Sequence, residues 1–198
     1  LEALRQPIED GFVTITRASA RSTYPAQFML VAAMNPCPCG NYGSRITPCR
    51  CTAQQIQRYR NRISGPMLDR IDIHVEMGEV GYNDIAGRSC GEPSSAIRAR
   101  VNAARAIQTR RYAGMGILFN AQLTNRMMNQ YCVLTSDAES LMKKAFAALK
   151  LSARAYTRLL KVSRTIADLA GSEQIKAEHI AEAIQYRSLE SKYWGEIK

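Results

Sequence analysis

The sequence predicts an α/β region followed by an all-helical region, and three observations support this division. Apolar runs at 28–34 and 71–75 are typical of strands buried on both faces of a parallel sheet. Four glycines and a proline mark residues 78–94 as an exposed linker. Beyond the linker, apolar residues recur at helical spacing. We therefore expect a partial α/β domain over 1–77 and a helical domain over 95–198.

The α/β region is expected to open with a helix and a β-hairpin. Residues 1–10 have the pattern of a short amphipathic helix. Residues 13–17 alternate like a strand, and a return strand begins at Thr23 after a small polar turn. Arg17 and Arg21 therefore lie near the tip of the predicted hairpin.

A polar residue follows the first predicted buried strand. The run 28–34 stops at Asn35, just before Pro36. In open α/β folds, ligands bind at the carboxyl ends of the strands, so we expect Asn35 at such an edge. A second helix, capped by Thr52 and running to about Ser64, precedes the second apolar run.

Capping residues mark the helices of the second region. The pattern predicts a helix over 96–112, with arginines on its outer face. Ser136 and Glu139 have the spacing of a capping box that opens the next helix. Ser152 is expected to cap a longer helix, and a last helix follows after about Lys176.

Composition indicates a basic protein that does not cross a membrane. The chain has 198 residues, 27 Lys and Arg against 17 Asp and Glu, and a net charge of +10. Such a charge favours a polyanionic partner such as nucleic acid. The longest apolar run has seven residues, whereas a spanning helix needs about 20. No signal peptide is visible, so we expect a cytoplasmic protein. Residues 1–5 resemble the middle of a helix, which suggests the C-terminal part of a longer protein.

Four of the six cysteines form a metal-binding pattern of two Cys-x-Cys pairs separated by nine residues. Four thiolates satisfy tetrahedral Zn²⁺ at about 2.3 Å each. Two alternatives remain open, namely reduced thiols with a structural role and redox-sensitive disulfides. The candidate zinc ligands are Cys37, Cys39, Cys49 and Cys51.

Four segments resemble one family of proteins. They begin Leu-Glu-Ala-Leu-Arg-Gln-Pro (1–11), Ala-Ala-Met-Asn-Pro-Cys-Pro-Cys-Gly (32–40), Ile-Gln-Arg-Tyr-Arg-Asn-Arg-Ile-Ser-Gly-Pro-Met-Leu-Asp-Arg (56–75) and Leu-Ser-Ala-Arg-Ala-Tyr (151–169). Together they resemble the ComM/YifB group of Mg-chelatase-related AAA+ ATPases of bacteria. The resemblance implies the C-terminal half of an AAA+ P-loop ATPase domain followed by an all-helical lid.

The resemblance also implies a function and three site residues. Members form ATP-driven rings, commonly hexamers, that bind ATP and Mg²⁺ between subunits, and ComM-type members are associated with DNA unwinding and branch migration during natural transformation. By position, Asn35 matches sensor 1, Arg70 the arginine finger and Arg154 the sensor 2 arginine of the lid. An ordinary salt bridge with Asp69 or Asp72 is the alternative for Arg70.

The chain departs from the family in one respect, because it contains no Gly-x-x-x-x-Gly-Lys-[Ser/Thr] phosphate-binding loop. We therefore expect this chain alone to be unable to hydrolyse ATP. The hairpin occupies the place in the chain where related DNA translocases carry a pore-facing hairpin. In that position Arg17 and Arg21 would contact DNA phosphates. The alternative is that the tip of the hairpin is simply exposed to solvent. Two other functions stay open: a Mg-chelatase-like metal-insertion motor and a non-catalytic zinc-bearing nucleic-acid-binding module.

Overall fold

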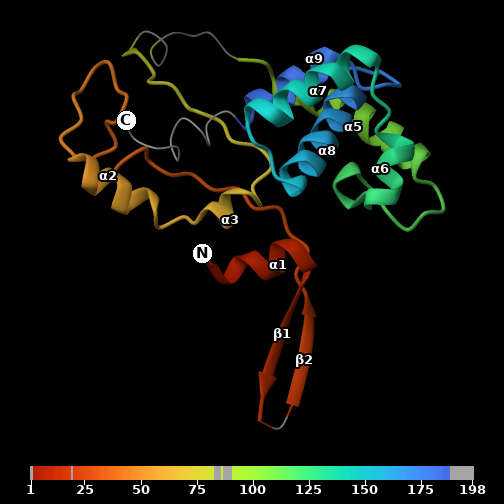
Figure 1. Cartoon of the computed structure of the whole chain (residues 1–198), viewed down its shortest axis with the longest axis horizontal. Coiled ribbons are helices and arrows are strands. Elements are labelled where there is room, and N and C mark those ends of the chain that lie inside the picture. Colours follow the sequence, from red (N-terminus) through yellow and green to blue (C-terminus); the bar gives the residue numbers. More distant parts are fainter. Residues whose placement is uncertain (1, 19, 83–85, 87–90, 188–198) are drawn as a thin grey trace. The chain divides into compact units, whose positions relative to one another are not determined.

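The computed structural model describes residues 2–18, 20–82, 86 and 91–187 (Figure 1). The described residues divide into two compact units, one running up to His74 and the other from Val75 to Arg187. No helix among the described residues is both long and apolar enough to cross a bilayer.

The first unit consists of short elements joined by long segments without helix or strand. Gly11 ends the first helix in a left-handed conformation with φ of 72°, and its N–H donates to Pro7 O at 2.9 Å. Such a φ suits glycine because other residues pay a steric cost there. The elements are a 3₁₀ turn at Glu2–Leu4, α1 at Arg5–Asp10, β1 at Phe12–Arg17, β2 at Ala20–Pro25, α2 at Ala53–Arg60 and α3 at Gly65–Leu68.

The predicted hairpin is confirmed, with a tighter turn than the sequence suggested. Strands β1 and β2 pair antiparallel, from Phe12 opposite Pro25 to Arg17 opposite Ala20. The Oγ1 atoms of Thr14 and Thr23 lie 3.1 Å apart across the strands. β2 is exposed along its whole length, and Figure 1 shows the pair projecting from α1 as a narrow ribbon.

The two predicted buried strands are wrong for the described chain. Residues 28–34 and 71–75 form no strand, and the hairpin is the only sheet among the described residues. Met29 is 88% exposed and Val31 84% exposed. A buried parallel strand needs neighbours for its backbone groups and packed layers on both faces, and no other described segment supplies them.

The second unit is helical, as predicted, and has a continuous apolar core. The core gathers around α8, where Leu159 and Ala167 are almost fully buried, together with Ile180 of α9 and Met142 of α7. The elements are α5 at Ser94–Arg111, a 3₁₀ turn at Asn120–Gln122, α6 at Asn125–Tyr131, α7 at Ser136–Ala148, α8 at Ala153–Leu169 and α9 at Ala177–Gln185.

Two predicted helix caps, Thr52 and Ser152, are confirmed, and one is displaced by a residue. Ser152 caps α8 and accepts a hydrogen bond from Ala155 N at 3.1 Å. Thr135, rather than Ser136, caps α7. The reason is a backbone bridge, because Thr135 N donates to Ile175 O at 3.0 Å and holds Thr135 in an extended conformation.

A buried carboxylate organises the polar interior of the second unit. Asp168 accepts hydrogen bonds from Asn120 Nδ2 at 2.8 Å, Arg111 Nη1 at 2.9 Å and Arg164 Nε at 3.1 Å. Burial by itself would raise the pKa of Asp168, but the hydrogen bonds from Arg111 and Asn120 outweigh it and hold that pKa below its usual value. Arg111 therefore belongs to the interior network and not to the solvated outer face of its helix.

Candidate functional site

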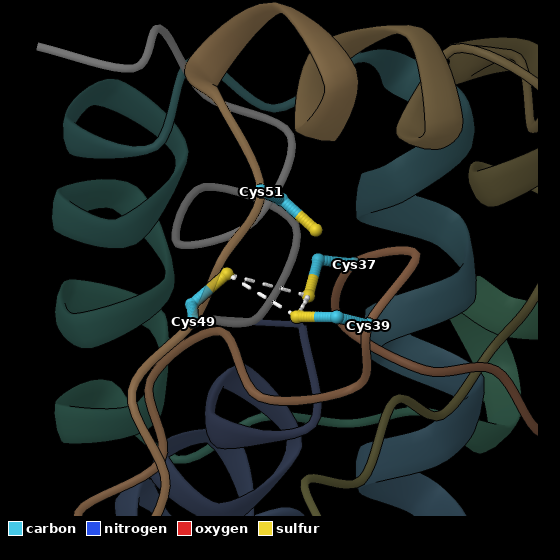
Figure 2. A group of neighbouring side chains, drawn as sticks. All are labelled: Cys37, Cys39, Cys49 and Cys51. Atoms are coloured by element: carbon cyan, nitrogen blue, oxygen red, sulfur yellow. Dashed lines mark hydrogen bonds between the residues drawn. The ribbon is translucent and has the colours of Figure 1, made fainter.

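The structure brings the four predicted metal ligands together. The Sγ of Cys37 lies 3.4 Å from that of Cys39 and 3.7 Å from that of Cys49, and the last two are 3.6 Å apart. All four sulfur atoms, including that of Cys51, lie within 4.8 Å of one another. Figure 2 shows their side chains converging from two stretches of one loop. Tetrahedral zinc with bonds of about 2.3 Å would space the sulfurs about 3.8 Å apart, so the cluster has the size of a zinc site.

Backbone turns and a buried arginine fix the loop that carries the cysteines. Gly40 and Gly43 have φ of 84° and 85°, which allows two reversals between the cysteine pairs. Arg60 of α2 is 2% exposed, and its guanidinium lies 4.6 Å from the ring centroid of Tyr42. Its Nε donates to Pro36 O at 3.3 Å. The loop is therefore attached to α2 on both sides of Cys37 and Cys39.

Two thiols of the cluster differ in acidity because backbone hydrogen bonds act on one and desolvation on the other. Hydrogen bonds from the backbone of Asn41 and Arg50 lower the pKa of Cys39 to about 6. Desolvation raises the pKa of Cys51 to about 12, and the neighbouring thiols add to this effect. A cation bound among the four sulfur atoms would favour their thiolate forms. The separations also exceed the 2.05 Å of a disulfide bond, and all four cysteines are free.

Arg70 is held inside the first unit. It lies two residues after the end of α3, whose start is capped by Ser64 through a hydrogen bond from Met67 N at 3.2 Å. Its Nη1 donates to Pro66 O at 2.6 Å, and its Nη2 forms an ion pair with Glu9 of α1. The side chain is only 11% exposed. The sequence around Arg70 indicated only Asp69 and Asp72 as ion-pair partners. Glu9 was missed because it is far from Arg70 in the sequence.

The other two residues matched to the ATP site are exposed. Asn35 lies at the start of the cysteine loop, where its Nδ2 is 3.8 Å from the position that a Cβ on Gly40 would take. Arg154 lies in the first turn of α8 in the second unit, two residues after the cap Ser152. Asn35 therefore lies beside the cysteine loop of the first unit, and Arg154 lies on the surface of the second unit.

The hairpin arginines are exposed on opposite faces of the ribbon. Thr16 pairs with Arg21 and Arg17 pairs with Ala20, so the two arginines belong to consecutive cross-strand pairs. Because side chains alternate between faces along a strand, consecutive pairs point to opposite sides. Arg17 and Arg21 thus flank the tip rather than forming one cluster.

Comparisons with known proteins identify the family. A family model described as magnesium chelatase, subunit ChlI, matches residues 1–85, and the model of the ChlI C-terminal region matches residues 91–187. The chain is 45% identical over 190 residues to competence protein ComM of Haemophilus influenzae, covering 96% of the chain and 36% of that protein. It is 43% identical over 191 residues to YifB of Salmonella typhimurium, an uncharacterized protein, covering 96% of the chain and 37% of YifB. The chain thus spans little more than a third of the length of these relatives, and it belongs to the ComM/YifB-like, magnesium-chelatase-related family.

Proposed function

We propose that this chain is the C-terminal part of an AAA+ ATPase that couples ATP hydrolysis to DNA unwinding or branch migration in a cytoplasmic ring, commonly a hexamer. The main support is the 45% identity over 96% of the chain to a protein named for competence. The net charge of +10 fits a polyanionic partner.

The exposed apolar segments of the first unit agree with this proposal. In an AAA+ domain, runs such as 28–34 and 71–75 are inner strands of the sheet. Met29 and Val31, which are almost fully exposed in this chain, would be covered once neighbouring strands from the rest of the longer protein complete that sheet. The phosphate-binding loop and the Mg²⁺ ligands would lie in that remaining part too, since the chain contains no such loop.

Three residues of this chain would act on the γ-phosphate of ATP. Phosphoryl transfer depends mainly on positioning and on neutralising charge, so cations delivered from outside the phosphate loop accelerate it. Asn35 would orient the attacking water, and Arg154 would contact the nucleotide from the lid. Arg70 would reach the site of the neighbouring subunit, which requires its guanidinium to leave Glu9. Short α3 and its Ser64 cap give Arg70 a rigid base for that movement.

The function is tested by the ATPase activity of the full-length protein with and without DNA. We expect single-stranded or forked DNA to stimulate hydrolysis, because a motor that moves on DNA couples the two events. An ATPase rate that stays the same at saturating DNA would contradict the proposal.

Magnesium insertion into a porphyrin is the second candidate, and the description of both family models as magnesium chelatase favours it. The same assay separates the two functions. Stimulation by a porphyrin substrate together with its partner subunits, and none by DNA, would favour the chelatase. A protein that binds DNA without any ATPase activity would instead be a zinc-bearing nucleic-acid-binding module.

In the same proposal Cys37, Cys39, Cys49 and Cys51 hold one structural Zn²⁺, because four free thiols lie at the spacing of a tetrahedral site. Native mass spectrometry should find one zinc ion per chain. Cys37→Ser should lose it. Cys132→Ser is the matched control, since Cys132 is also buried but lies in the core of the second unit. A metal-free wild-type chain after zinc-replete expression would contradict the site.

A further inference from the structure

The outer face of α2 carries arginines for which the described part of the chain supplies no carboxylate partner. Ile56 and Arg60 point inward and are 4% and 2% exposed. The opposite side, formed by α2 and the turn that follows it, carries two arginines and three amides that surround an open depression of about 350 Å³, lined by Gln54, Gln57, Arg58, Asn61 and Arg62. All five side chains are exposed, and this set is called the α2 face below.

The charge pattern of the surrounding segment differs from that of an ordinary solvated helix face. Residues 36–68 contain five arginines and no acidic residue or lysine. A solvated helix usually mixes both signs, with carboxylates that pair with the cations. Neither Arg58 nor Arg62 has an ion-pair partner among the described residues. A bound zinc with four thiolates would carry about −2 in charge and still leave the segment positive.

The residue types on the α2 face suit phosphate. Arg binds phosphate oxygens through two parallel N–H donors, whereas the amides of Gln and Asn donate single hydrogen bonds. Side chains of these kinds make most of the sequence-independent contacts to nucleic-acid backbones. Arg58 lies in the last turn of α2 and Arg62 in the turn that follows the helix, and both line the same depression.

The α2 face is also held rigidly. Thr52 and Gln55 form a capping box, with Thr52 N donating to Gln55 Oε1 at 2.9 Å. On the inner face, Arg60 joins the helix to the cysteine loop through Tyr42 and Pro36. The Nε2 of Gln57 donates to Asn61 Oδ1 at 2.8 Å, which orders the amides along the face. Prepositioned donors lose little conformational entropy on binding.

We infer that the α2 face binds the phosphodiester backbone of nucleic acid, as a second contact surface besides the hairpin. This inference rests on the proposed function, because it assigns a further DNA contact to the same motor. It does not depend on ATP hydrolysis, and it makes the cysteine loop the support that holds a DNA-binding helix in place.

The test is a salt titration of DNA affinity, using the full-length protein and a single-stranded oligothymidine or a duplex of the same length. Neutralising two phosphate contacts with Arg58→Gln and Arg62→Gln should reduce the slope of log K against log[salt] by about 1.4 on the single strand and about 1.8 on the duplex. Affinity at 0.1 M salt should fall roughly tenfold or more. Because both arginines are exposed, the fold should survive, and the pair Arg58→Lys with Arg62→Lys should keep most of the slope.

Controls separate the inference from the proposed function. Arg98→Gln with Arg110→Gln removes two exposed charges from α5 and should leave the slope unchanged. If the α2 variant keeps the wild-type slope while Arg17→Gln with Arg21→Gln lowers it, the α2 inference is wrong and the DNA motor stands. If the α5 and α2 variants reduce the slope of log K against log[salt] equally, the overall charge of the protein explains binding and the α2 inference is wrong. If the wild-type protein binds neither oligonucleotide, the proposed function itself fails.

Discussion

The two units of this chain are stabilised in different ways. The second unit has a continuous apolar core, in which Leu159, Ile175 and Ile180 are buried almost completely. The first unit places apolar residues such as Met29 and Val31 in solvent and is held by polar contacts, short caps and the cysteine loop. The second unit therefore has the means to fold on its own contacts, whereas the first unit would gain most from a zinc ion bound at the proposed site.

Removing the proposed zinc ion should affect only the first unit, and it is the largest effect we expect. Structural zinc contributes about 10–16 kcal/mol of apparent binding free energy in small zinc domains. A chelator, or Cys37→Ser, should therefore increase the hydrogen exchange of α2 by orders of magnitude and leave α8 protected. Equal loss of protection in α2 and α8 would contradict the independence of the two units.

Breaking the Asp168 network should destabilise the second unit. Asp168→Asn leaves Arg164, which is fully buried, without its carboxylate, and removing one partner of a buried pair costs about 3–5 kcal/mol. Thermal unfolding monitored by hydrogen exchange in α8 measures this loss. Asp137→Asn is the matched control, because Asp137 lies in the exposed first turn of α7, and it should change stability little.

The same carboxylate makes the second unit sensitive to acid. Since the pKa of Asp168 is lowered in the folded state, its stabilising contribution is complete above the unfolded pKa of about 4 and is lost as the pH falls through the folded value. Stability should therefore decline from about pH 4 downward, and the decline should be smaller in Asp168→Asn. An unchanged pH profile in that variant would mean that another group is responsible.

Local signals predicted local features well. The Cys-x-Cys spacing predicted the cysteine cluster, the alternation at 13–17 predicted the hairpin, and Ser152 predicted the start of α8. Each of these features depends on residues that are close in sequence. Asp168 and its partner Arg111 are 57 residues apart, as Arg70 and Glu9 are 61 apart. No periodicity encodes such pairs. The apolar composition of 28–34 predicts that the segment is buried, but it does not predict which segment it packs against.

The smallest expected effect concerns a single cap of the second unit. Ser152→Ala removes the acceptor for Ala155 N, which should cost about 0.5–2 kcal/mol in the free energy of unfolding. Chemical denaturation of the second unit measures it, and Ser152→Asp should restore most of the loss. If Ser152→Asp lowered the free energy of unfolding as much as Ser152→Ala, loss of the cap would not be the cause.

The central claim, ATP hydrolysis assisted by Arg70 across a subunit boundary, is tested most directly by the ATPase rate of two full-length variants in the assembled ring. Arg70→Ala removes the guanidinium. Glu9→Gln breaks the ion pair between Glu9 and Arg70 but leaves the guanidinium of Arg70 in place. An arginine supplied in trans accelerates the best-studied nucleotide hydrolases by about 10³–10⁵. We predict a loss of that order in Arg70→Ala and a rate close to wild type in Glu9→Gln. Wild-type hydrolysis by Arg70→Ala, or an equal loss in both variants, would contradict the claim.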